Sequence, residues 1–414
     1  MSEPGLTDDG ATTGVLGGRW RATVTPWGAV VPWPHQLGDD EPALDWHIAA
    51  DDRWHTPQHE AAVRQTRVEG TAVVETRVRI PNGDAVQRVY SVPEHGGLTI
   101  IEIENASPLA IAVAFTRGDL LSVRQPTAPI EGIELPAGSV AFPLGHHATL
   151  TVALPHDRRG AGALPQRLPP AAGVVRGWLA TVERAGRLLL PDPVLNERVV
   201  ADRCELALGG PAHPDDDAVA FLLGVGQLVR MGERADPWMP DVAHAVELAA
   251  KRGPKDWAFA AALDAAAVVF ATAGDEVAQR DLAAVRRRVP AGGPLPSAAP
   301  SEPARWLAWT ELRLVQASVS GAVLLPLGLP SDWAGSNFEV YGLPTGAASS
   351  VSFAVRWHGA RPAVLWEQSG GNVALCSPEL APDWSSAEVK GEALWPEPKG
   401  MHFPAPPVEG ESFS

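Results

Sequence analysis

The chain has 414 residues, enough for two or three domains with a sizeable hydrophobic core. Its 45% hydrophobic and 20% charged residues are typical of folded globular proteins. The net charge of -16 and the pI near 5.2 argue against nucleic acid, whose phosphates require Lys and Arg, and against an anionic membrane surface as partners.

No targeting or membrane segment is expected. Residues 1–14 have neither a basic region nor an apolar core, so they do not resemble a signal peptide. The apolar stretch 258–273 is shorter than the roughly 20 residues that span a bilayer, and Asp264 interrupts it. Cys204 and Cys376 lie far apart and fit neither a zinc nor a redox spacing. We therefore expect a cytoplasmic protein with no cofactor and no bound metal.

The N-terminal region has β character. After a tail over 1–13 that is expected to be disordered, residues 14–156 predict an antiparallel β-sandwich, since short strands alternate with turns about every ten residues. The alternating strand 70–80 is followed by Pro-Asn-Gly-Asp, which predicts a hairpin because Asn-Gly accepts positive φ. Two more strand pairs are expected, 96–107 with 110–117 and 138–145 with 147–154.

Residues 157–173 are rich in Gly, Pro and Arg and predict a linker. The period then becomes helical, and 174–318 predicts a layer of helical hairpins. Asp192 is expected as an N-cap, with Pro193 in the first turn. Seven helices with short connections are expected, over 174–190, 192–208, 215–233, 239–253, 254–274, 275–289 and 304–317.

The last part returns to β-strands. Residues 319–396 predict a small C-terminal β-module, and the Pro-rich stretch 397–414 predicts a disordered tail. Its strands are expected within 321–328, 337–344, 349–359, 361–368 and 372–378. The fold class is therefore α+β and multidomain.

Residues 44–60 form an excursion that is dense in Trp, His and acids. His55 and His59 are four apart, as on one face of a helix, but Pro57 makes a helix there unfavourable, so a metal site is not expected.

The same excursion leaves two other interpretations open. Trp46 and Trp54 are either anchors in the sheet or an aromatic platform for a sugar, because the C–H groups of a pyranose stack on an indole. Asp51 and Asp52 are candidate substrate-binding groups beside them, although adjacent acids on a strand point to opposite faces.

The order of a β-sandwich, a linker, helical hairpins and a β-module resembles the six-hairpin glycosidase superfamily of glucoamylase, glycogen-debranching and disaccharide-phosphorylase type. The stretch 177–203 is similar to the start of the toroids of that family, and 338–367 looks like a C-terminal β-module of actinobacterial proteins with this layout. The resemblance implies an (α/α)6 toroid of twelve helices. With about 145 residues between the β-regions, this toroid would be at most half-built, at ~30 residues per helix with its loop.

The resemblance also implies a mechanism. Inverting members use two carboxylates roughly 6.5–9.5 Å apart, one as acid and one as base. Glu233 and Asp236 are the candidate catalytic pair, with Trp238 as a sugar-binding ring and Arg230 and Arg234 as neighbours that tune their protonation.

Two classes of function stay open at this stage. The chain is either a reduced glycoside hydrolase or a non-catalytic scaffold that binds carbohydrate, another small molecule or a protein. The acids Asp215, Asp216, Asp217 and Asp256 are better explained as helix N-terminal residues than as catalytic ones.

Overall fold

The computed structural model describes residues 10–34, 41–127, 130–157, 160–289, 292–318 and 321–399. The chain divides into two compact units. Unit 1 contains Met1–Thr181 and Glu197–Gly210, and unit 2 contains Val182–Asn196 and Pro211–Ser414. The predicted helical layer and the predicted C-terminal β-module therefore belong largely to one unit. Most of both predicted tails lies outside the described residues.

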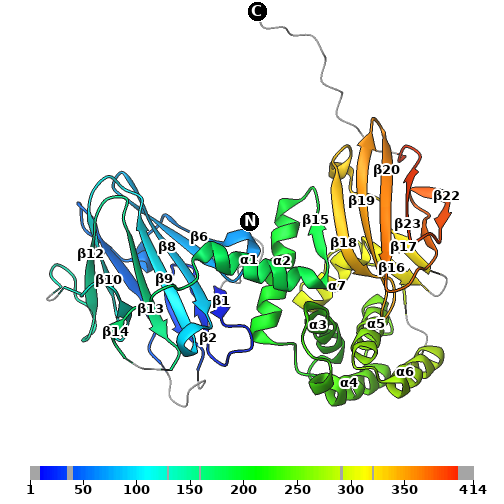
Figure 1. The fold of residues 1–414 in the computed structure, drawn as a ribbon, viewed down its shortest axis with the longest axis horizontal. Helices are drawn as coiled ribbons and strands as arrows, with labels where there is room; N and C mark the ends of the chain where they lie inside the picture. The colour runs from blue at the N-terminus through cyan, green and yellow to red at the C-terminus, as the bar shows by residue number, and fades with distance from the viewer. Residues whose placement is uncertain are drawn as a thin grey trace, which may run out of the picture. The chain divides into compact units, whose positions relative to one another are not determined.

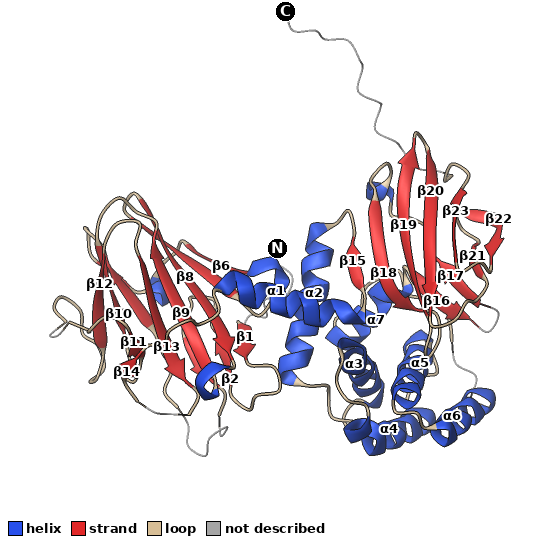
Figure 2. Ribbon diagram, viewed as in Figure 1, coloured by secondary structure: helices blue, strands red, loops and turns tan. Residues whose placement is uncertain are grey.

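Unit 1 is built from three sheets (Figures 1 and 2). A three-stranded sheet has the order β1-β2-β3, a four-stranded sheet β12-β10-β4-β5, and a seven-stranded sheet β14-β11-β13-β9-β8-β7-β6. The strands are β1 Ala11–Gly14, β2 Arg21–Val24, β3 Val30–Pro32, β4 Trp46–Ala49, β5 Trp54–His55, β6 Val63–Arg67, β7 Val74–Ile80, β8 Gly83–Val92, β9 Leu98–Asn105, β10 Ile111–Phe115, β11 Leu121–Ser122, β12 Val140–Leu144, β13 Thr149–Pro155 and β14 Gly162–Ala163. Since β1 is fully buried, the disorder predicted for residues 11–13 is wrong.

One of the three predicted strand pairs forms. β7 and β8 pair antiparallel up to Ile80 opposite Gly83, and Asn82 in the turn has φ 60°. The other two pairs are wrong, because β9 lies between β8 and β13 while β10 lies between β4 and β12. The chain thus alternates between the two sheets from β9 to β13, with β9, β11 and β13 in the seven-stranded sheet and β10 and β12 in the four-stranded one.

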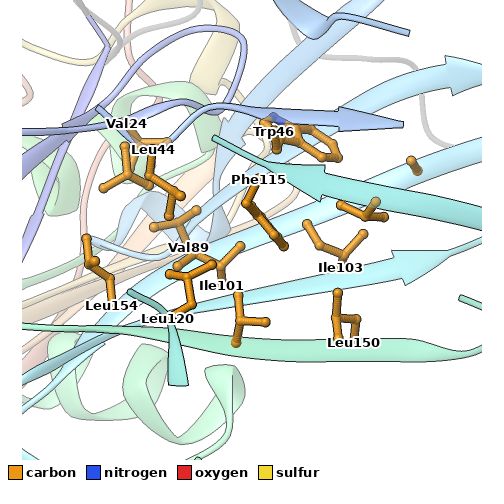
Figure 3. Close-up of a cluster of buried hydrophobic side chains, with 14 of the residues drawn as sticks. Val24, Leu44, Trp46, Val89, Ile101, Ile103, Phe115, Leu120, Leu150 and Leu154 are labelled. Carbon is orange, nitrogen blue, oxygen red and sulfur yellow. The ribbon is translucent and has the colours of Figure 1, made fainter. Parts of the chain in front are cut away.

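The reason for these crossings is a shared core. Buried side chains from all three sheets of unit 1 form one cluster, and Figure 3 shows some of them converging. Among them are Trp46 from β4, Ile103 from β9 and Phe115 from β10. A strand buried on one face must turn that face toward this cluster, so the side chains of consecutive strands meet across the core although the strands do not pair.

Seven α-helices lie in the described part of the chain. They are α1 Ala171–Val182, α2 Pro193–Gly209, α3 Ala218–Met231, α4 Met239–Lys251, α5 Trp257–Thr272, α6 Glu276–Arg288 and α7 Pro303–Leu312. Their starts follow local chemistry. Asp217 accepts a hydrogen bond from Ala220 N at 3.0 Å, and Asp256 accepts from the backbone of α5 in the same way.

Two predicted helical segments are strands instead. β15, Arg187–Leu189, pairs with β18, and β16, Val315–Ser318, pairs with β17. A glycine with φ 123°, Gly186, precedes β15 and ends the helical path after a short 3-10 turn. Extended backbone then gains hydrogen bonds at a sheet edge that a helix could not provide.

Unit 2 carries a five-stranded sheet, β15-β18-β19-β20-β23, and a four-stranded sheet, β16-β17-β21-β22. The strands not yet given are β17 Gly321–Leu324, β18 Phe338–Pro344, β19 Ser350–His358, β20 Arg361–Ser369, β21 Leu375–Ser377, β22 Ala381–Ser386 and β23 Lys390–Leu394. β22 and β23 were not predicted, because they contain Pro, Asp, Gly and Lys, which are rare in strands. The fold is α+β, with mostly antiparallel sheets.

Within the described ranges, no helix combines the length and the apolar character that crossing a bilayer requires.

Candidate ligand-binding cavity

Trp46 is a core residue and not a sugar-binding platform. Its side chain is 1% exposed, and its indole N–H donates to the carbonyl of Trp27 at 2.9 Å. A ring buried on both faces offers no surface for stacking. The predicted substrate-binding role of Trp46 is therefore wrong, and its alternative role as an anchor of the sheet is correct.

Trp54 and the two neighbouring aspartates lie at the edge of the four-stranded sheet. Trp54 is half-buried in β5 and its indole donates to Glu131 O at 2.9 Å. Asp51 is exposed. Asp52 is 45% exposed and contacts His55 Nε2 at 3.0 Å, a hydrogen bond that holds the pKa of the Asp52 carboxyl below its usual value.

A compact polar network closes this excursion. Glu60 accepts two hydrogen bonds from Arg53, at 2.7 and 3.0 Å, and lies 3.2 Å from Nδ1 of the buried His55. The bond to Arg53 is the main cause of a lowered pKa for Glu60. Each of these groups thus has a protein partner, so the network is explained by loop structure. In the described residues, no group of three or more His, Cys, Asp or Glu side chains could hold a metal ion.

The predicted catalytic pair lies on a surface turn between α3 and α4. Glu233 accepts a hydrogen bond from the indole of Trp238 at 3.1 Å. Asp236 and Arg234 are 3.3 Å apart, with side chains 68% and 83% exposed. Arg230 is directed to Glu311, so it does not pair with Glu233 as the sequence suggested. None of the turn residues Glu233, Asp236 and Trp238 lines the cavity described next.

A cavity of about 360 Å³ lies within unit 2, lined by α3, α5, α6, α7, β16 and the segment 344–347. Many lining residues that come from one helix are three or four positions apart, so they lie on the same face of that helix. Leu223, Gln227 and Arg230 come from one face of α3, and Ala261 and Asp264 from one face of α5.

Helices α3 and α5, which form two walls of the cavity, approach each other closely at Gly226. A Cβ on Gly226 would lie 2.7 Å from the Cβ of Ala265. Only glycine therefore permits this spacing of α3 and α5 beside the cavity.

A buried polar cluster faces the cavity. Glu311 of α7 is 7% exposed and accepts hydrogen bonds from Gln227 Nε2 at 2.9 Å and from Arg230 at 2.7 and 3.1 Å. Arg230 also donates to the carbonyl of Ala185. The Glu311 carboxylate fixes the amide orientation of Gln227, because only the NH2 group can donate to it. The Gln227 Oε1 is then buried and accepts no hydrogen bond from any described residue.

A second ion pair lies in the same wall. Arg286 of α6 contacts Asp264 at 2.6 Å, with side chains 41% and 49% exposed respectively. Burial by the surrounding helices raises the pKa of Asp264, and Arg286 opposes this rise. Asp264 is the sole charged residue in the sequence of α5. A lone charge in an apolar helix is a signal of a functional group, but in the sequence it was interpreted only as an interruption of an apolar run.

The rest of the described lining is mostly small and aliphatic, with two hydroxyl residues, Ser318 and Thr345, and none of it is aromatic. It consists mainly of alanines with a few larger groups, namely Leu223, Ala261, Ala265, Ala267, Val268, Ala308, Leu312, Val315, Ala317, Pro344 and Ala347. Each of the two carboxylates already pairs with an arginine. This arrangement suits the binding of a small molecule better than acid–base chemistry on a sugar, which needs one free acid and one free base.

Comparison of the chain with models of known protein families and with curated proteins finds no match to either. A functional proposal for this chain therefore rests on the cavity and its charged side chains.

Proposed function

We propose that this chain is a small-molecule-binding protein and that the cavity of unit 2 is its binding site. The observation that carries the proposal is the set of polar and charged side chains, the Glu311–Arg230–Gln227 cluster and the Asp264–Arg286 pair, in the wall of a cavity whose other lining is mostly small and aliphatic. Natural ligand sites combine an apolar lining with a few polar groups in this way, in volumes of roughly 300–1,000 Å³. Burying a polar group costs free energy unless it is hydrogen-bonded, and the buried Oε1 of Gln227 in this cluster accepts no hydrogen bond from any described residue.

The experiment is a screen of small molecules by thermal shift and native mass spectrometry on the full chain. Compounds that bind should raise the melting temperature. Replacing Ala261 and Ala308 together by Leu fills part of the cavity and should abolish that binding. Ala243→Leu, on the exposed face of α4, is the matched control and should leave binding intact. Binding that survives the filled cavity would place the site elsewhere.

The resemblance to the six-hairpin superfamily remains part of this proposal. On that basis, residues 14–156 are a β-sandwich related to the N-terminal domain of that family, and the helices within 174–318 are a truncated α/α toroid followed by a β-module over 319–396. The truncation supports the non-catalytic alternative, in which a scaffold of this ancestry binds a ligand or a protein partner. A cytoplasmic location is also proposed, supported by the two free cysteines, Cys204 and Cys376.

A second candidate function is glycan binding at Trp54. The supporting observation is that Trp54 is half-buried and that Asp51 and Asp52, three and two residues before it in the chain, are exposed. Trp54→Ala should then remove binding on a glycan array, while Trp27→Ala, at another half-buried indole, should not. An array with no positive glycan would rule this candidate out.

Glycoside hydrolysis at the turn between α3 and α4 has its own test. If purified protein hydrolyses any glycan, Glu233→Gln combined with Asp236→Asn should abolish turnover. Full activity in the double variant would exclude this turn as the site.

A further inference from the structure

We infer that the cavity takes an α-amino acid in its zwitterionic form, with an aliphatic side chain. This inference rests on the proposed function and specifies its ligand. Its basis is the pair Asp264 and Arg286, which brings one negative and one positive group to the same wall of the cavity.

The charges of the cavity divide into a closed pair and an open pair. Glu311 and Arg230 are 9% and 15% exposed at their side chains, and three hydrogen bonds converge on the carboxylate. A ligand would gain little from them without breaking those bonds. Asp264 and Arg286 are 49% and 41% exposed, so they are the charges that a ligand can reach.

The open pair has bonding capacity left. The contact at 2.6 Å joins one oxygen of Asp264 to one nitrogen of Arg286. A carboxylate has two oxygens with about four acceptor sites, and a guanidinium has five N–H donors. An ammonium group can therefore bind Asp264 while a carboxylate binds Arg286, and neither has to displace the existing contact.

A zwitterion matches this pair better than a ligand with a single charge. A simple amine would leave Arg286 without a ligand partner, and a simple carboxylate would place its charge close to Asp264. An α-amino acid carries both charges on adjacent carbons, at the spacing of a contacting ion pair. The unpartnered Oε1 of Gln227 adds one more acceptor to the wall and favours a ligand that brings N–H donors.

The lining of the cavity favours a ligand with an aliphatic side chain. Ala, Val and Leu groups surround the charged pair, and no described lining residue is aromatic, so stacking on a ring is not available. A volume of about 360 Å³ is ample for one aliphatic amino acid. Burial of an aliphatic side chain against these groups is favourable because it removes apolar surface from water.

The test is calorimetric titration of the full chain with three matched probes. These are L-leucine, 3-methylbutylamine, which lacks the carboxylate, and 4-methylpentanoate, which lacks the ammonium group. We expect L-leucine to bind about tenfold or more tighter than either analogue, because charge-assisted hydrogen bonds on both ends contribute.

Variants assign each end of the ligand. Asp264→Asn should weaken L-leucine and leave 4-methylpentanoate unchanged or improved, and Arg286→Gln should weaken L-leucine and leave 3-methylbutylamine unchanged or improved. Asp281→Asn and Arg280→Gln, exposed on the same helix α6 and outside the cavity, are the matched controls and should bind L-leucine normally.

The outcomes separate this inference from the proposed function. If the cavity binds other molecules in the screen but not L-leucine, or binds the three probes equally, the zwitterion inference is wrong and the binding function stands. If no molecule binds and the filled-cavity variant behaves like the unmodified protein, the proposed function fails as well.

Discussion

Arg230 of α3 donates to both carboxylate oxygens of Glu311 in α7, at 2.7 Å to Oε2 and 3.1 Å to Oε1. The two residues are 81 positions apart in the chain. This bidentate contact links α3 and α7 in the wall of the cavity. It therefore helps to set how the side chains of both helices are oriented toward the cavity.

Removing one partner of this pair should be more damaging than removing both. Glu311→Ala leaves the Arg230 charge buried and unpaired, and we expect a loss of about 3 kcal/mol or more in the free energy of unfolding of unit 2. Arg230→Met combined with Glu311→Leu should cost less, because no unpaired charge remains. Scanning calorimetry of the full chain measures both. A double variant less stable than Glu311→Ala would contradict the expectation, and Arg234→Ala, at an exposed ion pair, should change nothing measurable.

Substitution by alanine should have opposite effects on stability at Gly226 and at Gly177. Alanine is the better helix former by about 1 kcal/mol, so Gly177→Ala in the exposed face of α1, where a Cβ meets nothing within 4 Å, should stabilise the protein. Gly226→Ala should destabilise it, because its Cβ would lie 2.7 Å from that of Ala265. Thermal melts of the two variants test this directly. Stabilisation by Gly226→Ala would show that α3 and α5 can separate freely.

Asp202 should make unit 1 less stable as the pH rises. Burial raises the pKa of this carboxyl to about 6, against an ordinary value of 3.8, and Arg198 only partly opposes the rise. Its contribution to stability is therefore full below pH 3.8 and is lost as the pH rises through about 6. Asp202→Asn should raise the free energy of unfolding by up to about 3 kcal/mol at pH 8 and by little at pH 4. Equal effects at both pH values would contradict the sign.

His156 should have the opposite pH dependence. Its ring stacks on Trp20 at 4.1 Å and bonds to Thr99 at 2.9 Å, and burial is the main cause that lowers its pKa to about 4. Folding then favours the neutral ring, so its contribution is full above the ordinary value of 6.5 and is lost as the pH falls through about 4.

The variant His156→Phe keeps a stacked ring and cannot titrate. Its free energy of unfolding should therefore fall less than that of the unmodified chain between pH 6.5 and 4. Chemical denaturation across this range measures the difference, and Asp202→Asn as a background removes the opposing titration. A steeper acid loss in the phenylalanine variant would contradict the assignment.

Features of this protein that depend only on neighbouring residues could be predicted from the sequence. A turn at Asn82 needs only positive φ, and the helix starts at Asp217 and Asp256 need only a side-chain oxygen within three residues. Helical periodicity also predicted all seven helices, because the 3.6-residue repeat is a local property of the chain.

Features that depend on residues far apart in the chain are visible only in the folded structure. A tryptophan such as Trp46 has the same sequence signal in a core as on a binding surface, and only the packing of three sheets buries it. β15 is a strand because β18, about 150 residues later, offers it an edge, which no local pattern reports. The cavity has the same origin: Glu311, Arg230, Asp264 and Arg286 come from four different helices, and their pairing depends on helix packing that single-sequence periodicity does not encode.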